Sequence, residues 1–308
     1  MCLNSWVGCL LVAVMICGCG AKQDPYGQQV QRATSLSLQG EQWFSQGDLR
    51  RADRDFTRSL ELSRAVDHPQ GVAQQLNNLA AIALEQGDLE KARRLLVQAW
   101  ELNQDLQNWE QASTNQANLA TVAQKSGNLG KAEEHLRLAQ DAAQRSGSKP
   151  ALVRIYCRWA SLYLDQKQTV PARDFLEKAR AAASTPDLKG AWQYQWGRLC
   201  LLQGNTEAAV SNFTLALESD RKILDRAAMA SDLLYLGQAY QTRGDLSRAF
   251  YYYGRAFDVY AGLGKKTQLR LCLERLRQVN SQGNLRQSLE RFEQHPQLQA
   301  PPQKPSSS

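Results

Sequence analysis

The chain has 308 residues, of which 43% are hydrophobic and 22% are charged, with twenty Gly and nine Pro. This composition excludes disordered, collagen-like and proline-rich chains, and the length suffices for two domains or for one elongated array. The 37 Lys and Arg residues exceed the 30 Asp and Glu residues, so the formal net charge is +7, which favours an acidic protein, a nucleic acid or an anionic membrane as partner. The basic residues never form a run of five, and such spacing is also typical of a solvated helical surface.

The first apolar segment, residues 6–17, is uncharged. Its twelve residues are fewer than the roughly 20 that a membrane-spanning helix needs, so the segment is typical of a secretory signal peptide. It ends in Ile16-Cys17-Gly18-Cys19, which resembles the lipobox of bacterial lipoproteins. The resemblance implies that residues 1–18 are a cleaved leader, that Cys19 carries the lipid, palmitate included, and that Gly20 directs the protein to the outer membrane, facing the periplasm. An ordinary secretory signal and a buried apolar helix are the alternatives.

The two ends of the mature chain are predicted to lack a packed core. Residues 19–32 are polar and contain Pro and Gly, which predicts a flexible tether between the lipid and the body. Residues 296–308 are rich in Pro, Gln and Ser and contain one Leu. Because so little apolar surface cannot offset the entropy of ordering the chain, this segment is predicted to be a disordered tail.

Between these ends the chain repeats a turn signal. Six of its copies pair Gly with Asp or Asn, and one copy is Lys-Gln. Gly tolerates the left-handed backbone that ends one helix, and Asp or Asn caps the start of the next. The copies are separated by 40, 40, 40, 37, 40 and 39 residues, which predicts one repeated supersecondary unit. They are Gly47-Asp48, Gly87-Asp88, Gly127-Asn128, Lys167-Gln168, Gly204-Asn205, Gly244-Asp245 and Gly283-Asn284.

The apolar residues around each turn have helical spacing. Leu76, Leu79, Ala80 and Ala83 fall at i, i+3, i+4 and i+7 before Gly87, and a similar stripe follows it, which predicts two helices joined by a tight turn. In each unit a small residue of the first helix is predicted to let the backbones approach, and a larger residue of the second helix fills the gap. The small residues are Gly40, Ala80, Ala120, Ala160, Gly197 and Gly237, and the larger ones are Phe56, Leu96, Leu136, Leu176, Phe213 and Tyr253.

This pattern resembles the tetratricopeptide repeat family. The sixth repeat matches best, with Leu236-Gly237, Tyr240, Gly244-Asp245, Ala249, Tyr253 and Ala256 at the family's offsets. The resemblance implies an all-α, right-handed superhelical solenoid over residues 33–295, built from about six 40-residue repeats and a degenerate C-terminal capping repeat with a charged second helix. Because the usual repeat has about 34 residues, we expect extra helical turns or longer connections.

In this family the first helices line a concave groove that binds extended peptides. The family's groove positions select, among others, Asn78, Asn118, Arg154, Arg158, Tyr194 and Arg198. Asn118, Arg154 and Arg158 match three places of the family's clamp for a peptide carboxylate, whereas Asn77 and Ala81 replace the first Lys and Asn, so the full clamp is absent. The two arginines lie one turn apart and are expected to bind an acidic peptide. Alternatively, both are solvated or paired with Asp165, Asp174 or Glu177.

Motifs for catalysis or metal binding are not found in the sequence. His68, His135 and His295 have no Cys, Asp or Glu partner at metal-ligand spacing, and neither a nucleophile elbow nor a phosphate-binding loop occurs. We therefore expect no enzyme activity, no cofactor, no metal and no small-molecule substrate. Cys157, Cys200 and Cys272 are expected to be buried as small apolar residues, with Cys157 on the groove side.

The sequence thus predicts a lipoprotein that acts as a scaffold or assembly factor for a pilus, secretion or envelope complex. A regulator that senses a peptide or another ligand through a change of solenoid curvature is the alternative. Export would separate the protein from nucleic acid, which disfavours a nucleic-acid partner.

Overall fold

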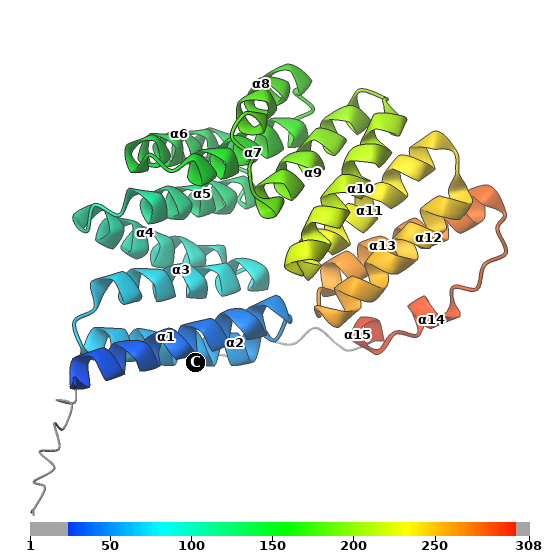
Figure 1. Ribbon diagram of the computed structural model, residues 1–308. Helices are drawn as coiled ribbons and strands as arrows, with labels where there is room; N and C mark the ends of the chain where they lie inside the picture. Colours follow the sequence, from blue (N-terminus) through cyan, green and yellow to red (C-terminus); the bar gives the residue numbers. More distant parts are fainter. Residues whose placement is uncertain (1–23, 300–308) are drawn as a thin grey trace, which may run out of the picture.

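The computed structural model describes residues 24–299, and these residues form helices without strands (Figure 1). The expected leader, the lipidation site Cys19 and residues 300–308 lie outside this range. The helices are α1 (Pro25–Ser45), α2 (Leu49–Ala65), α3 (Pro69–Gln86), α4 (Leu89–Asp105), α5 (Trp109–Lys125), α6 (Leu129–Ser146), α7 (Lys149–Asp165), α8 (Thr169–Arg180), α9 (Pro186–Leu202), α10 (Thr206–Ile223), α11 (Arg226–Arg243), α12 (Leu246–Gly262), α13 (Lys266–Gly283), α14 (Glu290–Glu293) and α15 (Pro296–Gln299).

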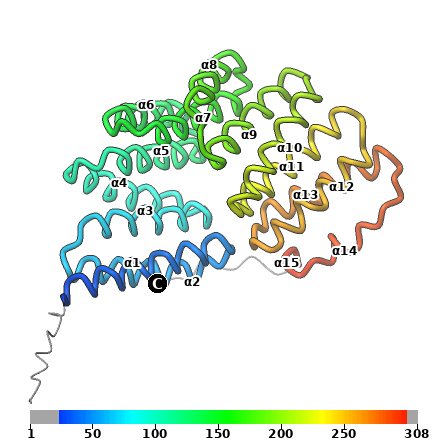
Figure 2. The backbone as a smooth tube through the Cα atoms, in the orientation of Figure 1, coloured from blue at the N-terminus to red at the C-terminus, as the bar shows by residue number. Residues whose placement is uncertain are grey.

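The first twelve helices form six consecutive antiparallel hairpins, and the hairpins stack into the predicted right-handed superhelical solenoid (Figure 2). Five hairpin turns contain Gly in the left-handed region, as at Gly87, where φ is +80°. The fourth turn has Lys167 at φ +58° in the same place, so the backbone of the turn is kept without the residue that adopts it most easily.

The long repeat has a simple origin. Most helices have 17 or 18 residues and are joined by short turns, so most hairpins are longer than a repeat of about 34 residues. The expectation of extra helical turns is confirmed. The exceptional interval of 37 residues contains α8, which has only 12 residues.

Gly and an aromatic ring pack together inside three of the hairpins. A Cβ placed on Gly40, Gly197 or Gly237 would lie 2.5–2.7 Å from a ring atom of Phe56, Phe213 or Tyr253 respectively. In the other three hairpins the small residue is Ala and the larger one is Leu, and all six of these side chains are buried. The predicted small-to-large pairing is therefore the packing rule of the hairpins.

The helical body extends beyond its predicted limits at both ends. Helix α1 begins at Pro25, so residues 25–32 are helical and do not belong to a tether, because Pro is favourable in the first turn of a helix. At the other end, α15 extends the packed body to Gln299, four residues into the predicted tail; the Gln297 side chain donates to the Ala261 carbonyl at 2.8 Å.

The C-terminal cap also differs from the predicted charged second helix. After α13 the described chain is irregular apart from the four-residue helices α14 and α15. Its central residue Phe292 is 2% exposed and packs edge-on against Phe257 of α12, with ring centroids 5.1 Å apart. One buried aromatic side chain thus covers the end of the core in place of a full helix.

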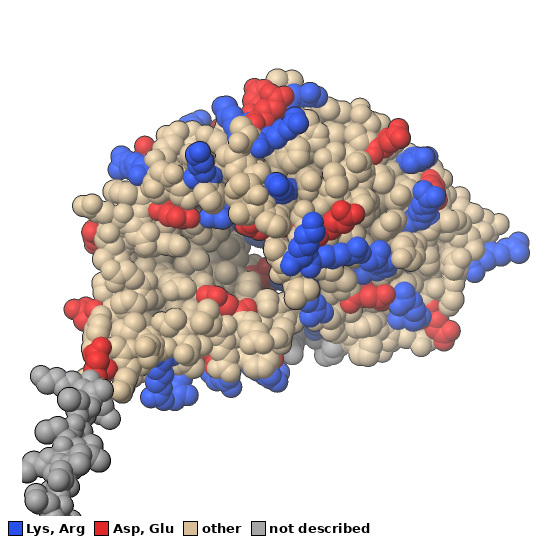
Figure 3. Space-filling view, in the orientation of Figure 1, with Lys and Arg blue, Asp and Glu red and all other residues tan. Residues whose placement is uncertain are grey.

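The two ends of the solenoid touch each other. Gly47, in the turn after α1, lies so close to Leu263, which follows α12, that a Cβ on Gly47 would lie 2.2 Å from the Leu263 carbonyl oxygen. Next to this contact Lys265 forms an ion pair with Glu85 of α3. The curved body therefore encloses a central hollow, which the space-filling view shows as a recess (Figure 3).

Among the described residues, no helix has both the length and the apolar character that crossing a bilayer requires.

Candidate functional site

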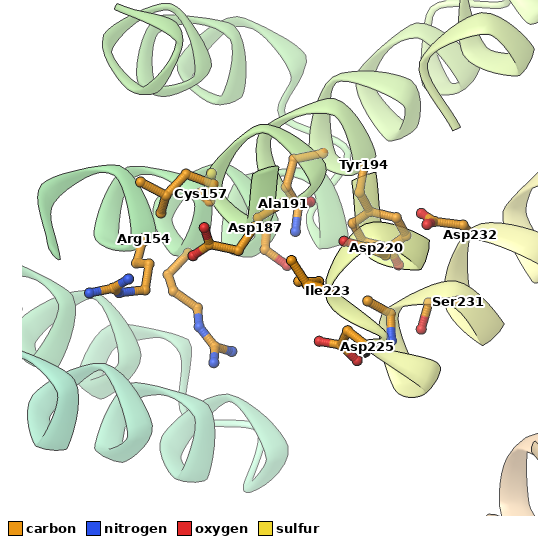
Figure 4. A pocket seen from close by; sticks show the side chains of 15 residues that line it. Arg154, Cys157, Asp187, Ala191, Tyr194, Asp220, Ile223, Asp225, Ser231 and Asp232 are labelled. Atoms are coloured by element: carbon orange, nitrogen blue, oxygen red, sulfur yellow. Dashed lines mark hydrogen bonds between the residues drawn. The ribbon is translucent and has the colours of Figure 1, made fainter. Parts of the chain in front are cut away.

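A pocket of about 490 Å³ opens on the concave side of the C-terminal half (Figure 4). It is formed by the first helices α7, α9 and α11 together with the end of α10. Its lining residues are Arg154, Cys157, Arg158, Ser161, Asp187, Leu188, Ala191, Tyr194, Gln195, Asp220, Ile223, Asp225, Ala228, Ser231 and Asp232. First helices line the pocket, as predicted, and three of the six predicted groove residues are among the lining.

The two arginines of α7 differ in their partners. Arg154 forms an ion pair of 3.2 Å with Glu110 of α5, an acid outside the three that the sequence suggested. Arg158 has no carboxylate within 4.0 Å in the described residues; its one side-chain hydrogen bond goes to the Thr121 hydroxyl at 3.4 Å. Arg158 is solvent-accessible, but it lies inside the hollow, where the surrounding protein displaces water and lowers the pKa of its guanidinium.

Arg198 is not available in the pocket. Its guanidinium forms an ion pair with Asp165 and donates to Ser161 at 3.0 Å and to Gln195 at 2.9 Å, and the side chain is only 10% exposed. Because Asp165 and Ser161 belong to α7, these contacts fasten α9 to α7. Arg198 therefore positions the pocket wall. Of the three arginines, Arg158 is the one without an ion pair within the described residues.

Tyr194 is the aromatic wall of the pocket. Its ring packs edge-on against Tyr235 of α11, with centroids 5.3 Å apart, and the Arg198 guanidinium lies 5.9 Å from its centre. Burial is the main cause that raises the pKa of the Tyr194 hydroxyl. Tyr194 thus stays neutral at physiological pH and offers a ring face and a hydroxyl.

Four aspartates line the same pocket, and the sequence reasoning missed all of them. Asp187 and Asp225 have local donors, since Asp187 accepts from the Thr185 hydroxyl and Asp225 caps α11 by accepting from the Ala228 amide at 2.9 Å. Asp220 and Asp232 are 5% and 1% exposed, they are hydrogen-bonded to each other, and neither forms an ion pair within the described residues. Burial, the charge of Asp220 and a hydrogen bond to Asp220 raise the pKa of Asp232 to about 9, and burial raises the pKa of Asp220 to about 6.

With this geometry established, comparison with protein families gives one clear result. Residues 22–211, more than half of the chain, match the model of the MalT-like TPR region. The chain belongs to this family. No protein of curated function matches the sequence.

Solved structures share the fold of this MalT-like TPR chain at low identity. BtubC from P. vanneervenii is 17% identical, with a TM-score of 0.51 over 78% of this chain and 93% of BtubC. A signal-transduction ATPase with a tetratricopeptide repeat sensor, from Pyrococcus horikoshii, is 18% identical, with a TM-score of 0.58 over 88% of this chain and 41% of that protein. At these identities the likeness establishes the solenoid fold.

The two predicted Asn residues of the MalT-like region lie in its N-terminal half. Asn78 lines a second pocket of about 290 Å³, whose walls carry mainly Asn and Gln side chains from α3, α4 and α5. Asn118 donates to the Asn77 side-chain oxygen at 3.0 Å, and Asn115 donates to the same oxygen at 3.1 Å. Neither Asn78 nor Asn118 lines the pocket of the arginines, and Asn118 belongs to an amide network between α3 and α5.

A signal for the missed aspartates does exist in the repeat register. Asp232 stands five residues before the small residue Gly237. The equivalent positions in earlier repeats hold Gln75, Asn115 and Ile155, which are all buried. The second, third and fourth repeats thus bury an uncharged residue where the sixth has a carboxylate, and this difference was visible in the sequence once the repeats were aligned.

The three downstream cysteines are buried, as expected. Cys157 lines the pocket but is only 6% exposed, and burial raises the pKa of its thiol to about 12. The thiol is therefore protonated and inert, and it contributes shape only.

Proposed function

We propose that this protein is a membrane-anchored, non-catalytic scaffold that holds a segment of a partner protein in the hollow of its solenoid. Arg158 carries the proposal, because its guanidinium lies in the hollow without a carboxylate partner in the described residues. A guanidinium presents a planar fork of donors that matches a carboxylate, so an acidic group of the partner is its natural complement. The role is binding, which is general among tetratricopeptide repeats.

The size of the pocket supports a peptide segment as the ligand. At about 490 Å³ it lies in the range of sites that enclose a few side chains or a small ligand. The second pocket, lined from α3, α4 and α5, offers amide donors and acceptors to an extended backbone. A partner segment that crosses both pockets would contact charged groups at one end and amides at the other.

We further propose that the anchor is a lipid on Cys19, attached after removal of residues 1–18, and that the protein faces the periplasm from the outer membrane, where it serves a pilus, secretion or envelope complex. The support is the Ile16-Cys17-Gly18-Cys19 motif and the following Gly20. Labelled palmitate is expected in the wild-type protein and not in Cys19→Ser, which would also leave the membrane fraction. Equal labelling of both proteins would exclude this site.

The scaffold proposal is tested by affinity capture of the tagged full chain from membranes. The double variant Arg154→Glu/Arg158→Glu is expected to lose a partner that the wild type retains. Arg94→Glu is the matched control, because Arg94 is exposed on α4 and lines neither pocket. Identical partners in all three samples would exclude recognition at the arginines.

The contact between the two ends of the solenoid favours a second candidate, a ligand-sensing regulator. A ligand in the hollow would act on both halves, and the contact of Gly47 with Leu263 would open or tighten in response. X-ray scattering with and without the captured partner distinguishes the two candidates, since a regulator changes its radius of gyration and a fixed scaffold does not.

A further inference from the structure

The pair Asp220 and Asp232 occupies a position that recurs between neighbouring repeats. Both residues lie 117 residues after Asn103 and Asn115, which face each other across α4 and α5. The Asn103 amide donates to the Asn115 oxygen at 2.8 Å, so that pair satisfies itself. The next equivalent pair is Ala143 with Ile155, which are both buried and apolar. Other repeats therefore fill this position without charge.

The two acids at this position share one proton and one hydrogen bond, and the rest of their hydrogen-bonding capacity is unmet by the described residues. Both oxygens of Asp232 are buried, and apart from Asp220 no side chain of the described residues forms a hydrogen bond with them. The close-up shows the Asp232 carboxylate pointing into the assembly around Tyr194 and Asp220 (Figure 4). No Lys or Arg of the described residues pairs with either acid. A buried carboxylate without a partner is costly, and a buried pair adds repulsion to that cost.

The pocket therefore has two unsatisfied sides of opposite charge. Within residues 24–299, Arg158 on α7 is a cation without an anion, and the proton-sharing pair of Asp220 on α10 and Asp232 on α11 is an anion without a cation. Both sides line the same cavity, and between them lie Tyr194 and the partly exposed apolar side chain of Ile223. Arg158 forms no ion pair with these aspartates, so the protein does not neutralise itself.

We propose that this pocket binds a ligand that carries an ammonium or guanidinium group against Asp220 and Asp232 and a carboxylate against Arg158. This inference rests on the proposed binding function and defines its ligand, a segment with a basic and an acidic side chain. It extends the expectation of an acidic partner, because four of the lining residues are themselves acids. The ring of Tyr194 adds a face on which a cation is stabilised.

The test uses the purified full chain in detergent and an array of capped hexapeptides. Each peptide carries one Lys or Arg and one Asp or Glu, and the array covers every spacing and both orders of these two residues. Matched arrays replace the basic residue with norleucine or the acidic residue with glutamine. Free lysine, free arginine and the corresponding dipeptides form a separate arm, which distinguishes a small zwitterion from a protein segment.

The repeat itself supplies the variant for the acidic side. Asp220→Asn/Asp232→Asn recreates the pair formed by Asn103 and Asn115, so the fold is expected to be kept. This variant and Arg158→Gln should each weaken binding about ten- to a hundredfold, since each removes a charge-assisted hydrogen bond. The controls Asp174→Asn and Arg94→Gln, exposed and outside both pockets, should bind like wild type.

Binding that needs the basic group and the aspartates supports the inference. The inference is overturned if peptides bind equally well with norleucine in place of the basic residue, or equally well to the double Asn variant. If Arg158→Gln still weakens the binding of those peptides, the scaffold function stands. Absence of binding to every probe also overturns it, and the capture experiment with Arg154→Glu/Arg158→Glu then decides separately whether the hollow binds a partner.

Discussion

Gly237 and Tyr253 are in direct contact across the sixth hairpin, and the ring occupies the space that a Cβ on Gly237 would need. That Cβ would lie 2.5 Å from Cδ1 of Tyr253, and Tyr253 is completely buried. The Tyr253 hydroxyl donates to Gln241 at 2.8 Å, which fixes the ring. The ring therefore cannot move aside without losing a hydrogen bond.

Gly237→Ala should accordingly destabilise the fold by up to about 2 kcal/mol, because overpacking costs about 1–3 kcal/mol and the gain in helix propensity returns about 1 kcal/mol. Gly237→Ala/Tyr253→Leu copies the Ala80 and Leu96 pair and should be more stable than the sum of the single variants predicts. Urea denaturation of the four proteins measures this coupling, and strictly additive effects would contradict the steric interpretation.

The ends of the solenoid provide a second prediction. Gly47→Ala should open the contact with Leu263 and increase the radius of gyration in X-ray scattering, because the new Cβ meets a backbone oxygen. Gly87→Ala is the matched control: its φ of +80° resembles the +83° of Gly47, but nothing lies within 4 Å of its Cβ. Both variants carry the same backbone strain, so only Gly47→Ala should expand the molecule.

The acid pair makes stability depend on pH. Because the pKa of Asp220 is raised to about 6 and that of Asp232 to about 9, the native state holds more protons than the unfolded state above pH 4. Stability should therefore fall as the pH rises from about 4 to about 9. Thermal denaturation of wild type and Asp220→Asn/Asp232→Asn across this range tests the prediction: the double variant should lose most of this slope.

The same acids predict proton release on ligand binding. At pH 7 the pair retains a proton, and a bound cation favours the ionised form, so affinity should increase between about pH 6 and pH 9. The titratable groups around the pair are Asp187 and Tyr194 on α9, Asp225 and Tyr235 on α11, and Tyr260 on α12. Calorimetry in two buffers of different ionisation enthalpy measures the release, and identical enthalpies would contradict it.

Arg198 should behave as a structural residue. Asp165→Asn removes the anion that faces a guanidinium only 10% exposed, and a loss of about 1–3 kcal/mol in unfolding free energy is expected, with Ser161 and Gln195 still in contact. Asp174→Asn, on the exposed face of α8, should leave stability unchanged. Equal stability of both variants would show that Arg198 does not fasten α9 to α7.

The sequence by itself determined the repeat, because helix and turn chemistry are local. Glycine at a left-handed turn, an Asp or Asn cap and apolar residues at helical spacing recur within forty residues, so the hairpins and the pairing of Gly40 with Phe56 or Ala80 with Leu96 were predictable. The limits of the body were not, since Pro25 starts a helix in a polar segment and Phe292 replaces a capping helix through a contact with Phe257.

Only the tertiary structure decided which charges remain unpaired. Arg154, Arg158 and Arg198 look alike in the sequence. In the structure, however, Arg154 pairs with Glu110 and Arg198 pairs with Asp165, which lie 44 and 33 residues away. Pairing across helices depends on how far the solenoid curves between repeats, and the local pattern does not encode that curvature. The same curvature brings Asp220 and Asp232 into one cavity with Arg158, and the ligand predicted for this protein follows from these opposite charges in one cavity.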